Sequence, residues 1–386
     1  MNVYFVYKNI ITGGCELLIE RLSRELKNRS ISVSIIFHSI DQNMQYRYEN
    51  AGLQLTKVDS WSRDKINASL DSKEAHIITF VWNDFILCNI NGSHIHTVFY
   101  AVHYQAFEMG RNKSKLFKEL LQKVAIKAIA RLSKNGQLIC MDEQTLKYTK
   151  KYYGLRTLQL PILRLAIDVV PKVERIIDAS QLHILTIARS EFPFKGYILG
   201  LLDWFATADN DVELTIVSYG PDEKNISNKI ESFDETVKKR ITFVGKTNYG
   251  KLEQYYKVAD LYVGMGTTVL DASLRGIVSI PVQAYTLDLI TDKFFFEDCR
   301  RVAIDEGSKD GFNTLFERYR ALDSKQKSNI SRRSREMVLD NYSSPVIADE
   351  LVHILASTKN NCSTIGLELV RLYHQIKTII KGDKRK

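Results

Sequence analysis

Short apolar runs alternate with amphipathic segments along most of this chain, and this alternation restricts the possible folds more than any other feature of the sequence. The segments between the runs carry apolar residues at helical spacing, as in Glu16–Asn28. Strands interleaved with helices predict parallel sheets with right-handed crossovers, which is an α/β fold. The expected strands are Val3–Tyr7, Val33–Phe37, Ile77–Val81, Thr97–Val102, Gln137–Met141, Ile184–Ala188, Leu214–Val217, Ile241–Val244, Leu261–Val263 and Val278–Ile280.

The length of 386 residues is sufficient for two domains of ordinary size. A mostly polar run, Lys172–Ser180, follows Leu160-Pro161-Ile162 and is typical of a linker. We therefore expect an N-terminal domain over 1–170, a second βα domain over 171–340, and C-terminal helices with a basic tail over 341–386. Those helices are expected at Arg332–Leu355, with a break at Asn341–Pro345, and at Thr364–Ile380.

The composition is that of a soluble globular protein, with 45% hydrophobic and 26% charged residues. No apolar stretch is long enough to span a bilayer, and the N-terminus lacks the features of a signal peptide. The five cysteines are odd in number and form no C-x-x-C pair, which argues against a disulfide framework and a zinc site. These features predict a cytoplasmic location.

The stretch from His183 to Tyr197 places an arginine and a lysine just after an expected strand. Arg189 ends the apolar run, and Lys195 precedes a segment with the character of a helix. Ligands of open α/β sheets bind at the carboxyl ends of strands, and two cations there suit a diphosphate. The alternative is that both are ordinary solvated loop charges.

A second stretch with suitable chemistry covers residues 263 to 281. Gly264 and Gly266 bracket a turn, and the two following threonines, Thr267 and Thr268, are expected to cap a helix and to offer donors to a phosphate or sugar. Asp271 lies about one turn inside that helix, where a carboxylate can accept from two vicinal hydroxyls of a ribose. The alternative for Asp271 is a surface charge or a helix-dipole charge. The loops at Gly220 and Gly245, which follow two other strands, are also expected at the donor site.

In the first half, the Gly13-Gly14 turn follows a strand and opens a helix, a place where backbone amides can approach an anion. The pattern is not G-x-G-x-x-G, so a plain βα turn is the alternative. His103 ends another strand on the same expected sheet edge. It is interpreted either as a functional histidine or as a structural one.

The segment from Asn112 to Asn135 is a basic amphipathic helix by pattern, and much of the net charge of +9 is concentrated in it. Such a helix can lie on an anionic membrane, and the basic tail Lys381–Lys386 offers a second contact. The alternative is a domain helix with a solvated face. Its basic residues are Lys113, Lys115, Lys118, Lys123, Lys127, Arg131 and Lys134.

These residues resemble those of the GT-B glycosyltransferases, and most closely the retaining glycosyltransferase family 4. The resemblance covers most of the chain and is strongest from Ile184 to Pro281. It implies two Rossmann-like βαβ domains facing a central cleft, with the C-terminal helices returning to the first domain. Arg189 and Lys195, in ARSEFPFKG, match the family's pair on the donor diphosphate, and the residues Gly266, Thr267 and Thr268 match its phosphate and sugar loop.

Three further residues are assigned by the same resemblance. Asp271 matches the second acid of the family's E-x7-E element, which holds the ribose. Glu16, with the two glycines before it, resembles the N-terminal glycine loop, and His103 resembles the histidine near the donor sugar. The first acid of E-x7-E would fall at Val263, where no acid stands, and an aspartate replaces glutamate at the second position.

The resemblance implies a retaining hexosyltransferase that moves a sugar from a nucleotide diphosphate sugar to a saccharide or lipid-linked hydroxyl. Its context would be bacterial-type surface polysaccharide assembly, such as O-antigen or capsule, at the inner face of the plasma membrane. No metal or other cofactor is expected. The alternatives are a nucleotide-sugar epimerase of the same fold and a non-catalytic GT-B binding protein. Nucleic-acid binding is not expected, because the chain lacks basic strands interleaved with aromatics and a recognition helix.

Overall fold

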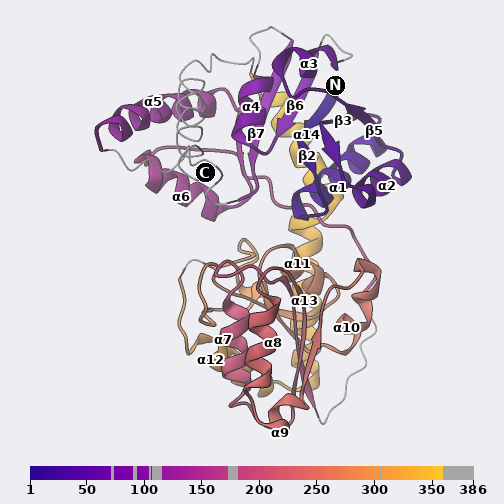
Figure 1. Ribbon diagram of the computed structural model, residues 1–386, viewed down its shortest axis with the longest axis vertical. Coiled ribbons are helices and arrows are strands. Elements are labelled where there is room, and N and C mark those ends of the chain that lie inside the picture. Colours follow the sequence, from indigo (N-terminus) through magenta and orange to yellow (C-terminus); the bar gives the residue numbers. More distant parts are fainter. Residues whose placement is uncertain are drawn as a thin grey trace, which may run out of the picture. The chain divides into compact units, whose positions relative to one another are not determined.

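The computed structural model describes residues 1–70, 74–89, 94–103, 106, 115–172, 181–304 and 306–359, and the chain divides into two compact units. Unit 1 comprises Met1–Ala166 and the segment that begins at Ser344, whereas unit 2 comprises Ile167–Ser343. The chain thus passes between the units at residues 166–167 and again at 343–344, where the sequence analysis placed its boundaries at 170 and 340. Figure 1 shows unit 1 in indigo and magenta with yellow α14, and unit 2 in magenta to orange.

Unit 1 contains a six-stranded sheet in the order β5-β3-β1-β6-β7-β8, in which every strand pair is parallel. In the central strand, Phe5 pairs with Ile35 on one side and with Ile78 on the other. All three side chains are buried, as expected for a parallel sheet that helices cover on both faces. The strands are β1 (Asn2–Val6), β3 (Ser32–Phe37), β5 (Gln54–Lys57), β6 (Ala75–Thr79), β7 (Ile95–Ala101) and β8 (Leu138–Cys140), and a separate parallel pair is formed by β2 (Asn9–Ile10) and β4 (Ser39–Ile40).

The helices of unit 1 follow these strands in the chain. The first helix buries Leu18, Ile19, Leu22 and Leu26 in the core, which explains its amphipathic pattern. Aspartate side chains cap two of the helices, with Asp41 accepting from the Met44 amide at 2.7 Å. The helices are α1 (Gly14–Asn28), α2 (Gln42–Asn50), α3 (Arg63–Ala68), α4 (Trp82–Cys88), α5 (Lys115–Lys134) and α6 (Glu143–Tyr153).

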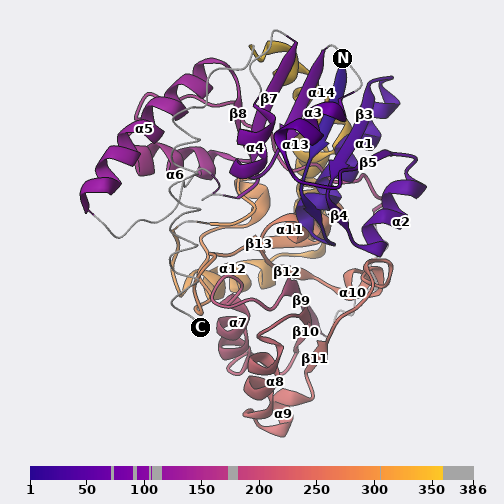
Figure 2. The same cartoon turned by 45° about the horizontal axis from the view of Figure 1, so that its top comes forward.

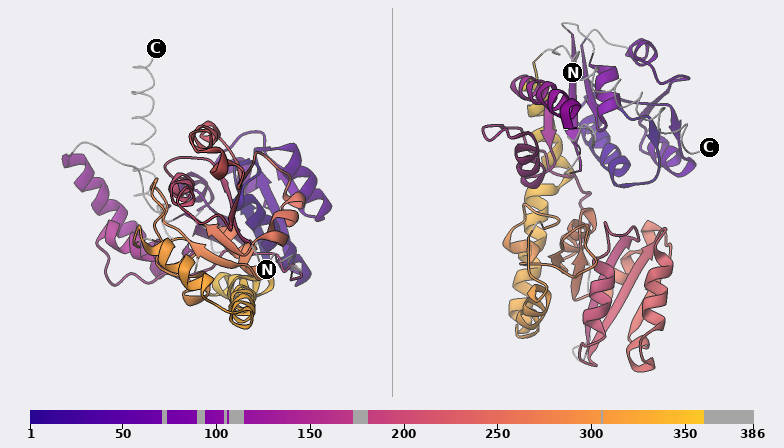
Figure 3. Two further views of the ribbon diagram at one scale, coloured as in Figure 1. Left: turned by 90° about the horizontal axis from the view of Figure 1, so that it is seen from below. Right: turned by 60° about the vertical axis from the view of Figure 1, so that its left-hand side comes forward.

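Unit 2 contains a five-stranded parallel sheet in the order β11-β10-β9-β12-β13 (Figure 2). Helices flank its strands in the right-hand view of Figure 3. The strands are β9 (Leu182–Arg189), β10 (Val212–Tyr219), β11 (Ile241–Val244), β12 (Leu261–Gly264) and β13 (Val278–Pro281). The helices are α7 (Tyr197–Phe205), α8 (Glu223–Glu231), α9 (Glu235–Lys238), α10 (Glu253–Val258), α11 (Thr267–Leu274), α12 (Gly311–Arg320) and α13 (Ser324–Tyr342), with 3₁₀ helices η1 (Tyr249–Lys251) and η2 (Phe295–Glu297).

The last described helix, α14 (Ser344–Ser357), belongs to unit 1. Its residues Ile347, Leu351 and Leu355 are buried in the same core as α1. Arg29, which follows α1, donates to Asp349 at 2.7 Å and to the Pro345 carbonyl at 2.8 Å. The chain therefore completes the core of its first unit with residues that come after the whole of the second.

The α/β class and the parallel sheets predicted from the sequence are confirmed. Each expected strand is present, with ends that differ by no more than a few residues. The predicted break at Asn341–Pro345 corresponds to Ser343, between α13 and α14. The helix predicted at Thr364–Ile380 lies outside the described residues.

Candidate functional site

The carboxyl ends of β10, β9 and β12 lie side by side in unit 2, because these strands are neighbours in the sheet. Tyr219, the last residue of β10, pairs in register with Arg189, the last residue of β9. The loop after β12 leads to Gly266 and α11. The strand order thus brings together the loops that the sequence analysis selected in this half of the chain.

Arg189 presents an exposed guanidinium at this edge. Its side chain is 61% exposed, and its Nε lies 3.7 Å from the Glu191 carboxylate, which is itself 52% exposed. An exposed ion pair of this length contributes little to stability, at most about 1 kcal/mol. The guanidinium can therefore turn to a bound anion at small cost.

Lys195 lies six residues further along the same loop and is half-buried. Its Nζ stands 4.9 Å from the centre of the Phe194 ring. Burial lowers the pKa of Lys195 to about 8, and the charge of Glu191 opposes this shift. Among the described residues, no carboxylate lies within 4.0 Å of its Nζ. A partly desolvated ammonium without an ion pair is a favourable place for an anion.

The conformation of this loop is fixed by backbone hydrogen bonds and by its neighbour. The Lys195 amide donates to the Glu191 carbonyl at 2.8 Å, and the Phe192 amide donates to Asp222 Oδ2 at 2.7 Å. Gly220 has a φ of +144°, and a Cβ there would lie 2.5 Å from the Ser190 carbonyl. Gly220 is therefore required for the close packing of the loops after β9 and β10.

The turn after β12 differs from the prediction at its helix cap. Gly266, with φ +75°, occupies the N-cap of α11, and no side chain caps this helix. The capping predicted for Thr267 and Thr268 is wrong, because both residues lie inside the first turn and Thr268 Oγ1 donates back to the Met265 carbonyl at 3.2 Å. The Val269 amide donates to the Gly266 carbonyl at 3.1 Å, so that the N-terminus of α11 starts directly after the turn that follows β12.

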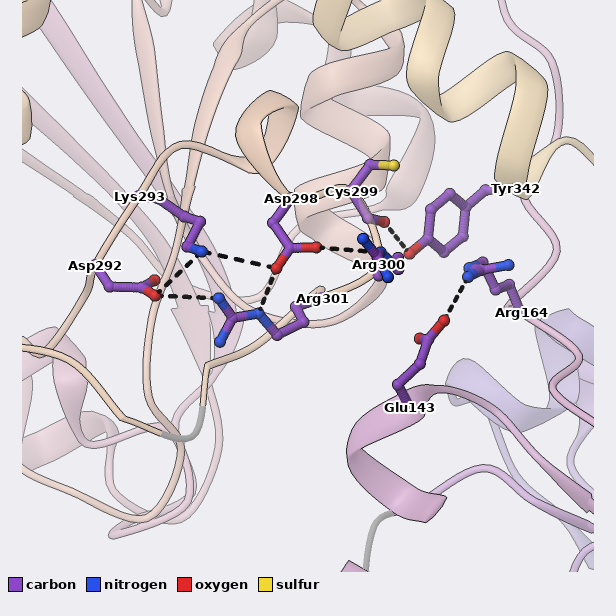
Figure 4. A network of polar contacts seen from close by, with 9 residues as sticks. All are labelled: Glu143, Arg164, Asp292, Lys293, Asp298, Cys299, Arg300, Arg301 and Tyr342. Atoms are coloured by element: carbon purple, nitrogen blue, oxygen red, sulfur yellow. Dashed lines mark hydrogen bonds and ion pairs between the residues drawn. The ribbon is translucent and has the colours of Figure 1, made fainter. Parts of the chain in front are cut away.

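An ion-pair network holds the segment that lies against this turn (Figure 4). Arg301 donates from Nε to Asp298 at 3.0 Å and from a terminal nitrogen to Asp292 at 3.1 Å. The next residue, Val302, accepts a hydrogen bond from the Gly266 amide at 2.7 Å. The network thus fixes the start of α11. The network is not predictable from the sequence, because its members are spread over a loop without a recognisable motif.

Asp271 is buried inside α11, with 6% of its surface exposed. Its carboxylate lies 3.7 Å from Arg275, whose Nε donates to Glu253 at 2.9 Å. The Arg275 guanidinium also lies 4.5 Å from the centre of the Tyr256 ring. This pairing differs from the surface charge that was the alternative interpretation. The ribose contact of Asp271 stays a prediction.

Of the other predicted glycines of unit 2, Gly264 is closely confined by its neighbours and Gly245 is less so. A Cβ at Gly264 would lie 2.6 Å from the hydroxyl of Tyr262, and a Cβ at Gly245 would lie 3.3 Å from Glu223. Val263, where the resemblance places an acid, is fully buried in β12. No polar group therefore comes from that position.

In unit 1, the glycine turn before α1 holds a carboxylate of the chain itself. Glu16 is 4% exposed, and a Cβ at Gly13 would lie 2.7 Å from its Oε2. Burial raises the pKa of Glu16, and hydrogen bonds from the backbone at Glu16 and Ile11 oppose that shift. The space next to Gly14 is open. This internal acid occupies the helix N-terminus that the sequence analysis assigned to a bound anion.

His103 lies two residues after β7 and is half-buried. Its carbonyl accepts from the Ala106 amide at 2.9 Å. The residues around it include several outside the described part of the chain. Its role at the donor sugar stays a prediction.

The basic helix α5 packs its apolar side into unit 1. Ile129 and Leu132 are buried in the core, while Lys123, Lys127 and Arg131 are exposed. Over this half of the helix, the apolar face is engaged by the protein itself, so a membrane would meet only the basic face. The tail Lys381–Lys386 and the start of the predicted helix, residues 112–114, lie outside the described residues. Among the described helices, none combines the length and the apolar character needed to cross a bilayer.

Large apolar side chains are exposed at the carboxyl edges of both sheets. Of the eight such residues in the described part of the chain, Tyr219 ends a strand of unit 2, Tyr285 and Leu287 follow another, and Ile11 and Val81 follow strands of unit 1. Single exposed apolar residues are common, but their concentration next to cations and helix N-termini is typical of ligand sites. Among the described residues, no cluster of His, Cys, Asp or Glu could hold a metal ion.

The comparisons with known proteins find likeness in structure only. No family model and no curated protein matches the sequence. HepE of Anabaena, crystallised with UDP and glucose, is 12% identical with a TM-score of 0.65, and the match covers 92% of this chain and 100% of HepE. The lipopolysaccharide outer core galactosyltransferase WaaB is 12% identical with a TM-score of 0.63, over 92% of this chain and 99% of WaaB.

A third similar structure is the N-terminal domain of a Candida albicans trehalose-6-phosphate phosphatase, at 11% identity and a TM-score of 0.65, with coverage of 92% and 97%. At such identities the comparisons establish the fold. The GT-B fold predicted from the sequence is confirmed by this likeness over nearly the whole chain. Because proteins of one fold differ in function, the activity has to be argued from the site.

Proposed function

We propose that the protein is a glycosyltransferase that moves a hexose from a nucleoside diphosphate sugar to a hydroxyl of a saccharide or lipid-linked acceptor. One observation carries this proposal. A single loop at the carboxyl edge of the unit 2 sheet presents an exposed arginine and a partly desolvated lysine, and the strand next to it in the sheet, β12, leads to the N-terminus of α11. This is the chemistry that a diphosphate requires.

The same groups serve the chemical step. As the bond between the anomeric carbon and the diphosphate breaks, negative charge develops on the leaving phosphate oxygens. Arg189 and Lys195, with the first-turn amides of α11, stabilise that charge, and their effect is larger where water is excluded. His103 contacts the donor sugar and Asp271 the ribose, as the resemblance implies. The reaction retains the configuration of the sugar, and no metal takes part.

The acceptor and its location are proposed from the basic surface of α5. Its exposed lysines and arginine suit the phosphates of an anionic membrane or of a lipid-linked acceptor. Two structural neighbours, HepE with bound UDP and glucose and the galactosyltransferase WaaB, support sugar transfer as the class of reaction. Surface polysaccharide assembly at the inner face of the plasma membrane is the context we propose.

The test is a mass-spectrometric screen of the purified protein. UDP-glucose, UDP-galactose, UDP-N-acetylglucosamine and GDP-mannose are each incubated with the protein, with and without an extract of lipid-linked saccharides. Nucleoside diphosphate release together with a glycosylated acceptor is the predicted result. A changed sugar without an acceptor would identify an epimerase, and binding without turnover would identify a non-catalytic protein, which the buried Val263 favours.

A further inference from the structure

We propose that the ring of Tyr285 stacks against the sugar ring of the donor. This residue would then contribute to recognition of the sugar and not to recognition of the nucleotide. This inference rests on the proposed function. Tyr285 lies in the segment after β13, and its side chain is 43% exposed. No motif or resemblance in the sequence marks this residue.

The backbone of Tyr285 is strained. Its φ is +60°, and among the described residues only one other residue that is not glycine, Ser30, has a positive φ. The left-handed region costs an L-residue roughly 1–2 kcal/mol, and a glycine would avoid this cost. An aromatic residue in this conformation therefore indicates a use for its side chain.

The ring of Tyr285 is held next to the loop that carries the cations. It lies 4.9 Å from the Phe194 ring at a tilt of 42°, and the Tyr285 amide donates to the Phe194 carbonyl at 3.2 Å. Phe194 in turn has the Lys195 ammonium 4.9 Å from its own ring centre. Phe194 therefore contacts both the exposed tyrosine and the desolvated cation.

The two loops are packed too closely to slide past each other. A Cβ at Gly196 would lie 2.5 Å from Leu287 Cδ2 and 2.6 Å from the Thr286 carbonyl. At the start of α7, a Cβ at Gly200 would lie 2.3 Å from the Leu289 amide nitrogen. The segment that carries Tyr285 is thus packed closely against the loop and helix that follow β9.

The chemistry of the donor indicates that the Tyr285 ring contacts the sugar and not the base. A nucleotide sugar carries a nucleoside, with its planar base, at one end of the diphosphate and the sugar ring at the other, and each of these rings can pack against an aromatic side chain. The unit 2 edge carries an exposed tyrosine on each side of the cation loop: Tyr219 on β10, with the Lys246 ammonium 5.9 Å from its ring, and Tyr285 after β13.

Charge develops on the phosphate that is bonded to the sugar, and a desolvated cation stabilises that charge best. Lys195 is such a cation, and Tyr285 is the tyrosine whose ring contacts Phe194, the residue before it. The C–H face of a pyranose is apolar with a partial positive charge, which suits the negative face of an aromatic ring. The tyrosine hydroxyl can bond a sugar hydroxyl.

The test is isothermal titration calorimetry with matched probes. UDP, UDP-glucose, UDP-galactose, GDP and GDP-mannose are titrated into the wild type and into Tyr285→Ala, Tyr285→Phe and Tyr285→Gly. For the nucleotide pair that the wild type binds, Tyr285→Ala and Tyr285→Gly should weaken the sugar nucleotide roughly threefold to tenfold and leave the nucleoside diphosphate unchanged. Tyr285→Phe keeps the aromatic ring and should therefore lose less affinity for the sugar nucleotide than either of these variants.

Two control variants and a melting curve make the result decisive. Tyr219→Ala should weaken the nucleoside diphosphate and the sugar nucleotide equally, and Tyr46→Ala, on the exposed face of α2, should change neither. Tyr285→Gly should melt no lower than Tyr285→Ala, because glycine relieves the strain. Equal losses for both ligands in Tyr285→Ala, or no loss for either, would overturn this inference alone. A wild type that binds none of the probes would overturn the proposed function as well.

Discussion

The carboxylate of Glu191 interacts with both cations that we propose as ligands of the diphosphate, Arg189 and Lys195. It pairs with Arg189 at 3.7 Å, and its charge also acts on Lys195. A bound diphosphate would compete with this carboxylate for the same cations. We therefore expect Glu191→Gln to tighten the binding of nucleoside diphosphates severalfold in calorimetry. The control is Glu231→Gln, an exposed acid paired with Lys238, which should change nothing. Weaker binding in Glu191→Gln would show instead that the carboxylate positions Arg189.

Lys195 gives the donor site a dependence on pH. Because its pKa in the ligand-free protein is about 8, the ammonium loses its proton as the pH rises through this value, and with it the attraction for a diphosphate. The affinity for UDP or GDP should thus change little between pH 7 and pH 7.5 and fall up to about tenfold per pH unit above pH 8. Lys195→Arg, which stays charged, should bind with the same affinity at pH 7 and pH 9. A wild type without this fall would show that Lys195 does not contact the phosphates.

The sequence was sufficient to predict site residues that follow a recognisable strand or helix. It was not sufficient for residues whose importance depends on local backbone geometry. Arg189 and Lys195 follow a recognisable strand, so their presence at its carboxyl end was predictable. The pairing of Asp271 with Arg275 could have been read from their spacing of four residues. The importance of Tyr285 depends on its φ value and on the loop it contacts, and neither is visible in a single sequence.

At the scale of elements, the neighbouring strands β6 and β7 each carry a histidine as their second residue, and the two histidines pair in register. The rings of His76 and His96 stack with centres 4.9 Å apart, and His76 is 4% exposed. Burial, His96 and the N-terminus lower the pKa of His76 to about 4, while Glu74 opposes them. The folded state therefore keeps His76 neutral, whereas the unfolded chain takes up a proton near pH 6.5.

This difference predicts a loss of stability in acid. As the pH falls from 6.5 to about 4, the unfolded chain binds more protons at this residue, and the fold loses roughly 3 kcal/mol. His76→Phe keeps an aromatic ring stacked against His96 but removes the group that takes up the proton. Urea unfolding at pH 7 and pH 4.5 should show a smaller difference in this variant than in the wild type. Equal differences in both proteins would contradict the assignment.

The link between α14 and unit 1 gives a second prediction at this scale. Leu351 is fully buried in the core formed with α1. Replacing it with alanine removes apolar contact and leaves a cavity, so Leu351→Ala should destabilise unit 1 by roughly 2–5 kcal/mol. The exposed Leu287, in the other unit, is the control for the same substitution. A change below 1 kcal/mol in thermal or urea unfolding would show that α14 contributes little to that core.

Most elements were predictable because their burial follows a simple period. The central strands are continuous apolar runs, and α1 has its apolar residues on one face. The edge strand β5, QLTK, was missed because it buries little and shows no apolar run. The helix break at Ser343 was predictable from Pro345, which cannot donate to the preceding turn.

For the whole molecule, the chain enters and leaves unit 2 at neighbouring positions. Ile167 and Ser343 form a parallel bridge, and the Ile167 amide donates to the Tyr342 carbonyl at 2.8 Å. The fold is shared with proteins that are 11–12% identical, because strand order and burial period can be kept while the side chains change. The function of the site depends on individual side chains, which differ between such proteins, so its chemistry must be measured on this chain.

The central claim is that Arg189 and Lys195 bind the diphosphate of the donor. The most direct test compares Arg189→Ala/Lys195→Ala with Lys325→Ala/Arg332→Ala, which removes the same charges from the exposed face of α13. Release of nucleoside diphosphate from the sugar nucleotides is measured with acceptor extract, and melting curves report the fold. We predict that the first variant loses affinity and turnover by roughly a hundredfold or more with an unchanged melting temperature, while the second is like the wild type. Turnover like that of the wild type in the first variant would contradict the account.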